Sequence, residues 1–390
     1  MLKLNNKERS ISDQINSLKA LAGSHSPSLQ NICNIIPEID LKVDACFLSN
    51  PYATDLFISF LEKELIKTSK LREVLEFYPS QNAVIAGYIS EVIKIDKKNI
   101  FVGNGAIEII QAIMQKFVKN NVIINIPTFS SYYEFVNDDT KVIYYELEKS
   151  NDYEICIEKY LEFIEIHKPE NIVLINPNNP NGGYIPYKDL RNLISHLSHL
   201  ENIIIDESFI HFAYEDNDLG MVSSTELFKE FPNVIVIKSM SKDFGIAGIR
   251  AGYAVLDRCK VSALLKNGYL WNSSGLSEYF FNLYKRPDFL NEYEIVRKKY
   301  ILETNDFFSE LKKIPQIRVY SSKANFALIE LLDGSASKDF VSKLLITYGI
   351  YARVGDDKIG LDGQFLRIAS RTKDENILII NALKSIFEYE

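Results

Sequence analysis

The fold is decided by the stretch Val234-Ile-Val-Ile-Lys-Ser-Met-Ser-Lys-Asp-Phe-Gly-Ile-Ala-Gly-Ile-Arg-Ala-Gly-Tyr253. Its four opening β-branched residues predict a buried strand. A turn rich in hydroxyl groups follows, then Lys242, then a glycine-rich loop that allows close backbone approach. Ser239, Ser241 and Arg250 are donors suited to a phosphate group. The stretch therefore predicts an amine beside an anion site at the end of a strand.

An amine beside an anion site is what pyridoxal 5′-phosphate requires, as a Schiff-base partner and a phosphate anchor. The stretch resembles the Ser-x-x-Lys…Gly-x-Arg-x-Gly-Tyr signature of fold-type I pyridoxal-phosphate enzymes, aminotransferase class I/II, and the resemblance covers roughly residues 45–385. It implies that Lys242 forms the Schiff base and moves protons at the substrate Cα. It also implies that Ser239, Ser241 and Arg250 bind the cofactor phosphate.

Composition agrees with a globular enzyme. The chain has 390 residues, of which 46% are hydrophobic and 25% charged, enough for one large and one small domain. A net charge of −8 argues against nucleic acid or an anionic membrane as a partner, so local basic groups would serve a small anionic ligand. The four cysteines have no paired spacing, and no metal site is expected. No apolar leader or run of transmembrane length occurs, which favours a cytoplasmic protein.

Short runs rich in valine and isoleucine alternate with helical patterns through the middle of the chain. This alternation predicts an α/β fold with a doubly wound, mostly parallel sheet covered on both faces. Ligands of such sheets bind at the carboxyl ends of the strands. The expected strands are Asn99–Val102, Asn121–Ile126, Lys141–Tyr145, Asn171–Ile175, Asn202–Ile205 and Val234–Ile237.

Three parts of the chain are expected. Residues 1–45 form an N-terminal helical lead-in, and residues 70–280 form a large cofactor-binding domain. Residues 46–69 together with 285–390 form a smaller α+β domain, in which helical segments alternate with the runs Ile317–Tyr320, Phe326–Ile329 and Phe365–Ala369. This division agrees with the fold-type I transferase that the resemblance implies.

Two further motifs follow expected strands. Gly103-Asn-Gly-Ala-Ile-Glu108 joins a strand to a helix. Such a turn is commonly only structural, but the free amides of Gly105, Ala106 and Ile107 could also bind the cofactor phosphate at the helix N-terminus. Asn176-Pro-Asn-Asn-Pro-Asn-Gly-Gly183 resembles the family's Asn-Pro-x-Asn-Pro-Thr-Gly motif. The resemblance implies that Asn179 donates a hydrogen bond to the phenolic oxygen of the cofactor.

Asp206 ends another expected strand, in Asp206-Glu-Ser-Phe209. It could be only a helix cap. The resemblance instead implies that it pairs with the pyridinium nitrogen, because a buried anion keeps the ring protonated as an electron sink. Most relatives carry a tyrosine three residues later, where this chain has Phe209, so one donor to the phenolic oxygen is missing. Phe129 is the aromatic residue that the resemblance places on the pyridine ring.

Tyr78, in Phe77-Tyr-Pro79, matches the tyrosine that reaches the cofactor phosphate of a neighbouring subunit. If that match holds, the enzyme is a homodimer with shared active sites. Of the five histidines, His25 and three others show no spacing of interest, and only His211, close after Phe209, is a candidate for a role in the site.

Three arginines and one asparagine are assigned to the substrate. Arg367, in Leu366-Arg-Ile-Ala-Ser-Arg371, matches the arginine that holds the α-carboxylate, and Arg371 is a second cation nearby in sequence. Arg353 matches a phosphate-binding arginine of histidinol-phosphate aminotransferases, with a surface salt bridge as its alternative. Asn50, in Asn50-Pro-Tyr, resembles the segment that lies over the substrate in that branch.

Two branches of the family compete for the reaction. Asp-Glu-x-Phe-Ile and Leu-Arg-Ile-Ala-x-Arg are similar to L-threonine O-3-phosphate decarboxylase, although His211 replaces that branch's aspartate, whereas the lysine loop is similar to the aminotransferases. We expect decarboxylation of O-phospho-L-serine or O-phospho-L-threonine to a phosphorylated amino alcohol. The alternative is transamination of a phosphorylated amine or ketone with glutamate and 2-oxoglutarate. A scaffold without activity is disfavoured, because Lys242, Asp206, Asn179 and Arg250 are all present.

Overall fold

The computed structural model describes residues 2, 4–21, 26–266, 268–269 and 271–388, so that His25 lies outside the described residues. The chain divides into two compact units. The larger unit contains Ser49–Asn179 and Gly183–Lys299, and the smaller unit contains Met1–Leu48, Pro180–Gly182 and Tyr300–Glu390. Among the described residues, no helix has the length and apolar character needed to cross a bilayer.

This division differs from the expected domain boundaries, and Pro180–Gly182, expected in the large domain, falls in the smaller unit. Residues 49–69 and 285–299 lie in the larger unit rather than with the small domain. The reason is burial, because α3 (Pro51–Leu61) and the start of α13 (Pro287–Leu311) place Phe57, Phe60, Phe289 and Tyr293 in the core of the larger unit. The N-terminal helix α1 (Asn6–Leu21) packs in the smaller unit.

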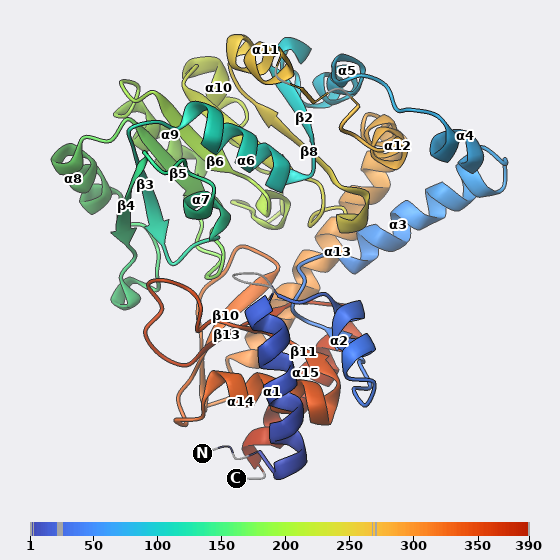
Figure 1. The fold of residues 1–390 in the computed structure, drawn as a ribbon, viewed down its shortest axis with the longest axis vertical. Helices are drawn as coiled ribbons and strands as arrows, with labels where there is room; N and C mark the ends of the chain where they lie inside the picture. The colour runs from blue at the N-terminus through green and yellow to red at the C-terminus, as the bar shows by residue number, and fades with distance from the viewer. Residues whose placement is uncertain (1, 3, 22–25, 267, 270, 389–390) are drawn as a thin grey trace. The chain divides into compact units, whose positions relative to one another are not determined.

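The described part of the larger unit contains a seven-stranded sheet of order β2-β8-β7-β6-β5-β3-β4 (Figure 1). Its strands are β2 (Ile100–Asn104), β3 (Asn121–Ile126), β4 (Lys141–Glu146), β5 (Asn171–Ile175), β6 (Asn202–Asp206), β7 (Val234–Ser239) and β8 (Ala251–Val255). β8 runs antiparallel to β2 and β7, while the pairs from β7 to β4 are parallel. The predicted fold class, an α/β protein with a mostly parallel sheet, is confirmed.

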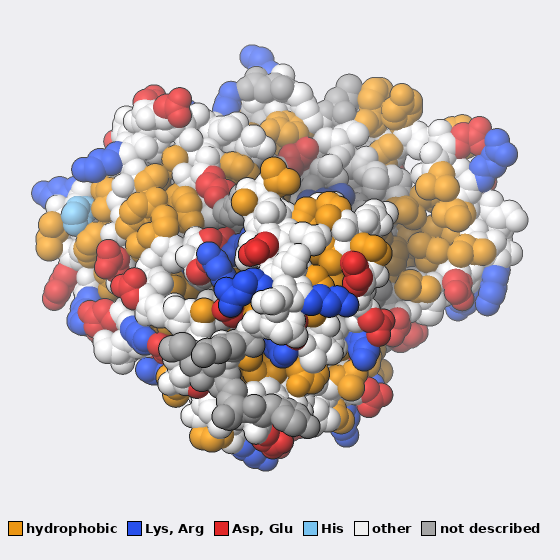
Figure 2. Space-filling view, turned by 60° about the horizontal axis from the view of Figure 1, so that its bottom comes forward, with side chains coloured by type: hydrophobic (Ala, Val, Ile, Leu, Met, Phe, Trp, Pro, Cys, Tyr) orange, Lys and Arg blue, Asp and Glu red, His pale blue; other side chains and the backbone are white. Residues whose placement is uncertain are grey.

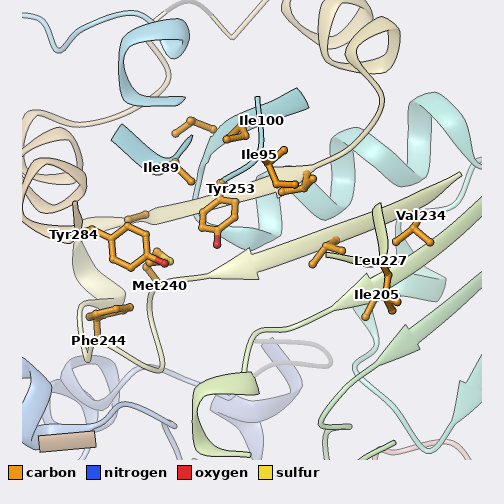
Figure 3. Close-up of a cluster of buried hydrophobic side chains, with 14 of the residues drawn as sticks. Ile89, Ile95, Ile100, Ile205, Leu227, Val234, Met240, Phe244, Tyr253 and Tyr284 are labelled. Carbon is orange, nitrogen blue, oxygen red and sulfur yellow. The ribbon is translucent and has the colours of Figure 1, made fainter. Parts of the chain in front are cut away.

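Helices cover both faces of this sheet, which explains why the strands other than the edge strand β4 are buried along nearly their whole length. One face packs against α6 (Ala106–Phe117), α7 (Ser131–Glu134) and α11 (Arg258–Lys266). The other packs against α5 (Asn82–Ile93), α8 (Ile157–His167), α9 (Tyr187–Ser195), α10 (Leu227–Glu230) and α12 (Gly275–Tyr284). Figure 3 shows this second core, to which the loop after β7 contributes Met240 and Phe244. A separate short helix, α4 (Leu71–Glu76), follows α3.

The smaller unit is α+β. Its described part holds a four-stranded antiparallel sheet of order β12-β13-β10-β9, from β9 (Ile317–Val319), β10 (Phe326–Leu331), β12 (Arg353–Val354) and β13 (Phe365–Ala369). A parallel pair joins β1 (Val43–Asp44) to β11 (Ile350–Tyr351). The helices are α1, α2 (Leu29–Ile35), α14 (Ser337–Tyr348), α15 (Lys373–Glu388) and the end of α13. The core of the unit, between α14, α15 and the sheet, is continuous and apolar.

Candidate active site

The predicted phosphate-binding elements come together at the start of α6. Gly105 precedes the helix with a φ of 80°, and a Cβ placed on it would lie 2.5 Å from Nη2 of Arg250. Arg250 has a φ of 63°, and its Nη1 donates to the carbonyl of Ala247 at 3.1 Å. A Cβ on Gly252 would approach the amide nitrogen of Ala106 to 3.0 Å. Glycine at both positions therefore leaves a cradle between the guanidinium and the helix N-terminus, next to Ala106 and Ile107.

The end of β7 and the loop after it carry the other predicted donors. Ser239 ends the strand and Ser241 lies in the loop. Both are 5% exposed, and the amide of Ser241 donates to Oγ of Ser239 at 3.2 Å. Lys242 is half-buried, and its carbonyl accepts a hydrogen bond from the amide of Asn50 at 3.0 Å. Asn50 caps α3 through Oδ1, and its buried Nδ2 finds no acceptor within the described residues. The side-chain amide of Asn50 is therefore available to a ligand, and the backbone amide of the same residue contacts Lys242.

Asp206 lies at the carboxyl end of β6 and is 3% exposed. Its carboxyl group accepts hydrogen bonds from the Tyr132 hydroxyl and from the amide of Ser208, each at 2.8 Å. Burial raises the pKa of Asp206, while these two donors and the charge of Lys238 lower it. The site thus holds a carboxyl group that burial disfavours as an anion and that a cationic ligand would stabilise.

The turns after β3 and β5 are joined by side chains. Asn178 accepts from Oγ1 of Thr128 at 3.1 Å and donates to the carbonyl of Pro127 at 3.0 Å. These contacts bring the segment of Asn179, which is 6% exposed, to the segment of half-buried Phe129. The amide of Asn176 donates to the carbonyl of Asp206 at 2.9 Å, which links the same turn to β6. Phe209, 4% exposed, begins the turn after β6.

Tyr78 is placed differently. It is 81% exposed, and its ring contacts that of Trp271 in a tilted arrangement, with centroids 5.2 Å apart. The predicted contact of Tyr78 with the cofactor of a neighbouring subunit stays a prediction.

The three predicted substrate arginines lie in the smaller unit. Arg353 and Arg367 are register partners on the antiparallel strands β12 and β13. Burial and neighbouring Arg353 lower the pKa of Arg367 to about 10, and its Nη2 donates to the carbonyl of Cys46 at 2.9 Å. Arg353 forms an ion pair with Asp357, and Nε of Arg371 lies 3.6 Å from Glu375. Two of the three cations therefore have carboxylate partners within their own unit.

Tyr132, which no sequence motif assigned to the site, lies against Asp206. Its position in α7, three residues after Phe129 at the end of a strand, was the available signal. The role becomes visible only when β3 and β6 are placed in one sheet.

Residues 47–383 match the aminotransferase class I and II family, and the chain belongs to it. The chain is 58% identical to an L-serine phosphate decarboxylase of Campylobacter jejuni, over 100% of both chains. It is 46% identical to an L-serine phosphate decarboxylase of Sulfurospirillum multivorans, over 99% of this chain and 98% of that one. The structure of a decarboxylase from Sulfurospirillum multivorans superposes with a TM-score of 0.94 at 47% identity, covering 97% of each chain.

The family depends on pyridoxal 5′-phosphate, as the sequence predicts, and the residues present fit this cofactor. The cradle between Gly105 and Arg250 suits a phosphate group, because a helix N-terminus and a guanidinium converge there. The buried carboxyl group of Asp206 suits a protonated pyridine nitrogen. Lys242, which lies between Asp206 and Arg250 in the sequence, supplies the amine. The predicted membership in this enzyme family is confirmed.

Proposed function

We propose that this protein removes the carboxylate of O-phospho-L-serine as CO₂ and releases a phosphorylated amino alcohol. The observation that carries the proposal is the similarity, over nearly the whole chain, to two proteins named L-serine phosphate decarboxylase. O-Phospho-L-threonine is the second substrate to test, because the motifs around Asp206 and Arg367 are similar to the threonine-phosphate branch.

The arginines of the smaller unit support a substrate with two anionic groups. Like charges directly opposite on neighbouring strands destabilise a sheet, and Arg353 faces Arg367 in register. An anion bound to these side chains would offset both the repulsion and the cost of burying Arg367. We assign Arg367 to the carboxylate and Arg353 to the phosphate, with Arg371 and Asn50 as further substrate contacts.

The reaction breaks the bond between Cα and the carboxylate, releases CO₂ and adds one proton to Cα. When bound, the cofactor supplies a protonated ring, conjugated with the substrate nitrogen, that accepts the electron pair left on Cα. Lys242 delivers the proton to Cα in this proposal. Asp206 holds the proton of the ring nitrogen, and Tyr132 and Ser208 orient Asp206 through their hydrogen bonds.

The test is incubation of the purified enzyme with O-phospho-L-serine and, separately, O-phospho-L-threonine, each with and without 2-oxoglutarate. The expected result is CO₂ and a phosphorylated amino alcohol without any need for the oxo-acid. Glutamate formation without CO₂ would overturn the proposal in favour of transamination. That second candidate is kept because the lysine loop is similar to those of aminotransferases.

We also propose that the enzyme is a homodimer. Apolar side chains are exposed along the segment from the end of α3 to Tyr78, and Figure 2 shows hydrophobic groups gathered at that end of the larger unit. The exposed fractions are 51% for Ile66, 66% for Leu75, 66% for Phe77 and 46% for Trp271. Such a patch on a soluble enzyme is typical of a protein interface. A second copy that covers it would also explain an exposed Tyr78.

Mixing two inactive variants tests the shared site. Lys242→Ala and Tyr78→Phe each damage every site in their own homodimers. A mixed dimer contains one site with both residues intact if Tyr78 acts in the partner's site, so activity should reappear on mixing. Mixtures that stay inactive while ultracentrifugation shows exchange of subunits would contradict the assignment of Tyr78.

A cytoplasmic location of the enzyme also stays a prediction.

A further inference from the structure

A buried ammonium group links the two segments that carry Lys242 and Asp206. Lys238, on β7, is 2% exposed, and its Nζ forms an ion pair with the carboxylate of Asp243. The same Nζ donates to the carbonyl of Glu207 at 3.1 Å. Asp243 follows Lys242 directly in the chain, and Glu207 follows Asp206 directly.

We propose that Lys238 is a positioning residue, which fixes Lys242 relative to Asp206 by holding Asp243 and the Glu207 carbonyl at once. The inference requires only that Lys242 and Asp206 serve the cofactor, whichever reaction follows. Neither Lys238 nor Asp243 takes part in the chemistry assigned above.

Apolar contacts hold the loop around Lys242 on both sides, and Lys238 adds a polar link from Asp243 in this loop to the end of β6. Met240 and Phe244, two residues before and two residues after Lys242 in the sequence, are both buried. Figure 3 shows these two side chains in the core. Phe244 stacks on Tyr293, with centroids 4.0 Å apart and planes 24° from parallel. Gly245 has a φ of 65°, and a Cβ there would lie 2.2 Å from Oγ1 of Thr54. These contacts fix the loop against α3 and α13, whereas the bonds of Lys238 tie it to the end of β6.

The charges around Lys238 belong to several elements and are arranged to keep it paired. Glu207 accepts hydrogen bonds from Ser223 and from Ser224, and burial raises its pKa. The pKa of His211 is held well below its usual range, chiefly by burial and further by the charges of Lys238 and Arg297. The His211 ring is therefore neutral at neutral pH. Its Nδ1 lies 2.8 Å from the Tyr293 hydroxyl and 3.5 Å from Asp243.

Arg297, fully buried on α13, completes the group by donating to the carbonyl of His211 at 2.8 Å and pairing with Glu294. Buried ion pairs often stabilise a fold no better than apolar side chains of similar volume. Geometry gives a reason for this one, because a single flexible ammonium reaches both segments of the site. The charge of Lys238 also lowers the pKa of Asp206, against the effect of burial.

A pair of variants separates positioning from plain stability. Lys238→Met leaves the buried carboxylate of Asp243 without its ammonium, so the Tm of the cofactor-free protein should fall. Adding Asp243→Asn removes that carboxylate, and the Tm should recover most of the loss. The double variant should nevertheless keep a kcat lowered by about 10- to 100-fold, with KM little changed, because the site is no longer held in register.

The second readout is the visible circular dichroism of the bound cofactor, which reports the orientation of the ring without any turnover. Its amplitude should stay reduced in the double variant. The matched control is Lys260→Met, which removes a half-buried lysine bound to Asn202 at the opposite end of β6. This control should lower Tm but leave kcat and the dichroism unchanged.

Two results would overturn the inference. One is a double variant that recovers Tm, kcat and dichroism together, which would make the pair merely structural. The other is a fall in kcat and dichroism in Lys260→Met as large as in the double variant. A wrong substrate assignment would show as absent CO₂ with the dichroism intact in the wild type, so the two failures are distinguishable.

Discussion

In the larger unit the buried carboxyl group of Asp206 accepts hydrogen bonds from residues of the same unit. In the smaller unit, by contrast, two arginines lie opposite each other on adjacent strands. Asp206 accepts hydrogen bonds from Tyr132 and Ser208. Arg353 and Arg367 are register partners, so their positive charges repel. Burial disfavours the charge in both places, because it raises the pKa of Asp206 and lowers that of Arg367 to about 10.

The difference matches the ligands that we assign to the two units. A cofactor that stays bound through every cycle needs a preorganised site, and Asp206 is already oriented by two hydrogen-bond donors. A substrate that enters and leaves gains affinity from an anion that offsets the burial and mutual repulsion of two cations. Conversely, the arginines gain most from binding, since the free protein bears the cost of their burial and repulsion.

The largest effect is expected from Lys242→Ala. The variant should fold, because the side chain is only half-buried, but turnover should fall by more than about 10⁴-fold through loss of proton transfer and of the covalent anchor. Thermal unfolding and the release of CO₂ measure the two quantities. Borohydride reduction and peptide mapping of the wild type should label Lys242, and a label on another lysine would refute the assignment.

Removing one arginine tests the other side of the comparison. Arg367→Met or Arg353→Met should cost about 2–5 kcal/mol of binding to O-phospho-L-serine if the ion pair with substrate is buried. Phosphate should raise the Tm of the wild type more than that of Arg353→Met. Arg318→Met, which changes an exposed arginine on β9, is the control. Equal binding of L-serine and O-phospho-L-serine by the wild type would contradict a phosphate site.

A pH dependence of stability is expected from the larger unit. Burial raises the pKa of Asp243 to about 6, although Lys238 lowers it in part. A raised pKa means that the folded protein binds the proton of Asp243 more tightly than the unfolded chain does. The contribution of this group to the free energy of unfolding is therefore complete below the ordinary pKa of 3.8 and is lost as the pH rises through about 6. The loss should approach about 3 kcal/mol.

Urea unfolding of the wild type and of Asp243→Asn between acid and neutral pH isolates this contribution, because the variant cannot ionise at that position. The stability of the wild type relative to the variant should decline as the pH rises. A relative stability that rises with pH would mean that the ion pair with Lys238 dominates burial and that the pKa of Asp243 is lowered.

The smallest effect concerns Phe209. A tyrosine at this position would donate a hydrogen bond to the charged phenolic oxygen of the bound cofactor. This bond would lower, by about one unit, the pKa that the visible absorbance of the cofactor reports. Spectrophotometric titration of Phe209→Tyr and the wild type compares the two values. Identical titrations would show that the side chain at position 209 does not face the cofactor.

Local sequence patterns determined the strands and the candidate residues at their ends. The β-branched runs form β3, β5 and β7 where predicted, because buried parallel strands need continuous apolar side chains. The same runs led to Lys242 and Asp206 as candidates, because Asp206 ends one of them, Lys242 follows another, and parallel strands bring their carboxyl ends to one edge. Their roles stay predictions.

Tertiary structure alone decided which of these groups touch. Lys238 continues the apolar run of β7 and nothing in its neighbours predicts an ion pair, yet folding buries it against Asp243. Tyr132 meets Asp206 from 74 residues away, and Arg353 meets Arg367 through strand register. Periodicity along the chain predicts which face a residue lies on. Contacts between distant segments depend on how strands pair and on where side chains point once the core is packed, which no local pattern records.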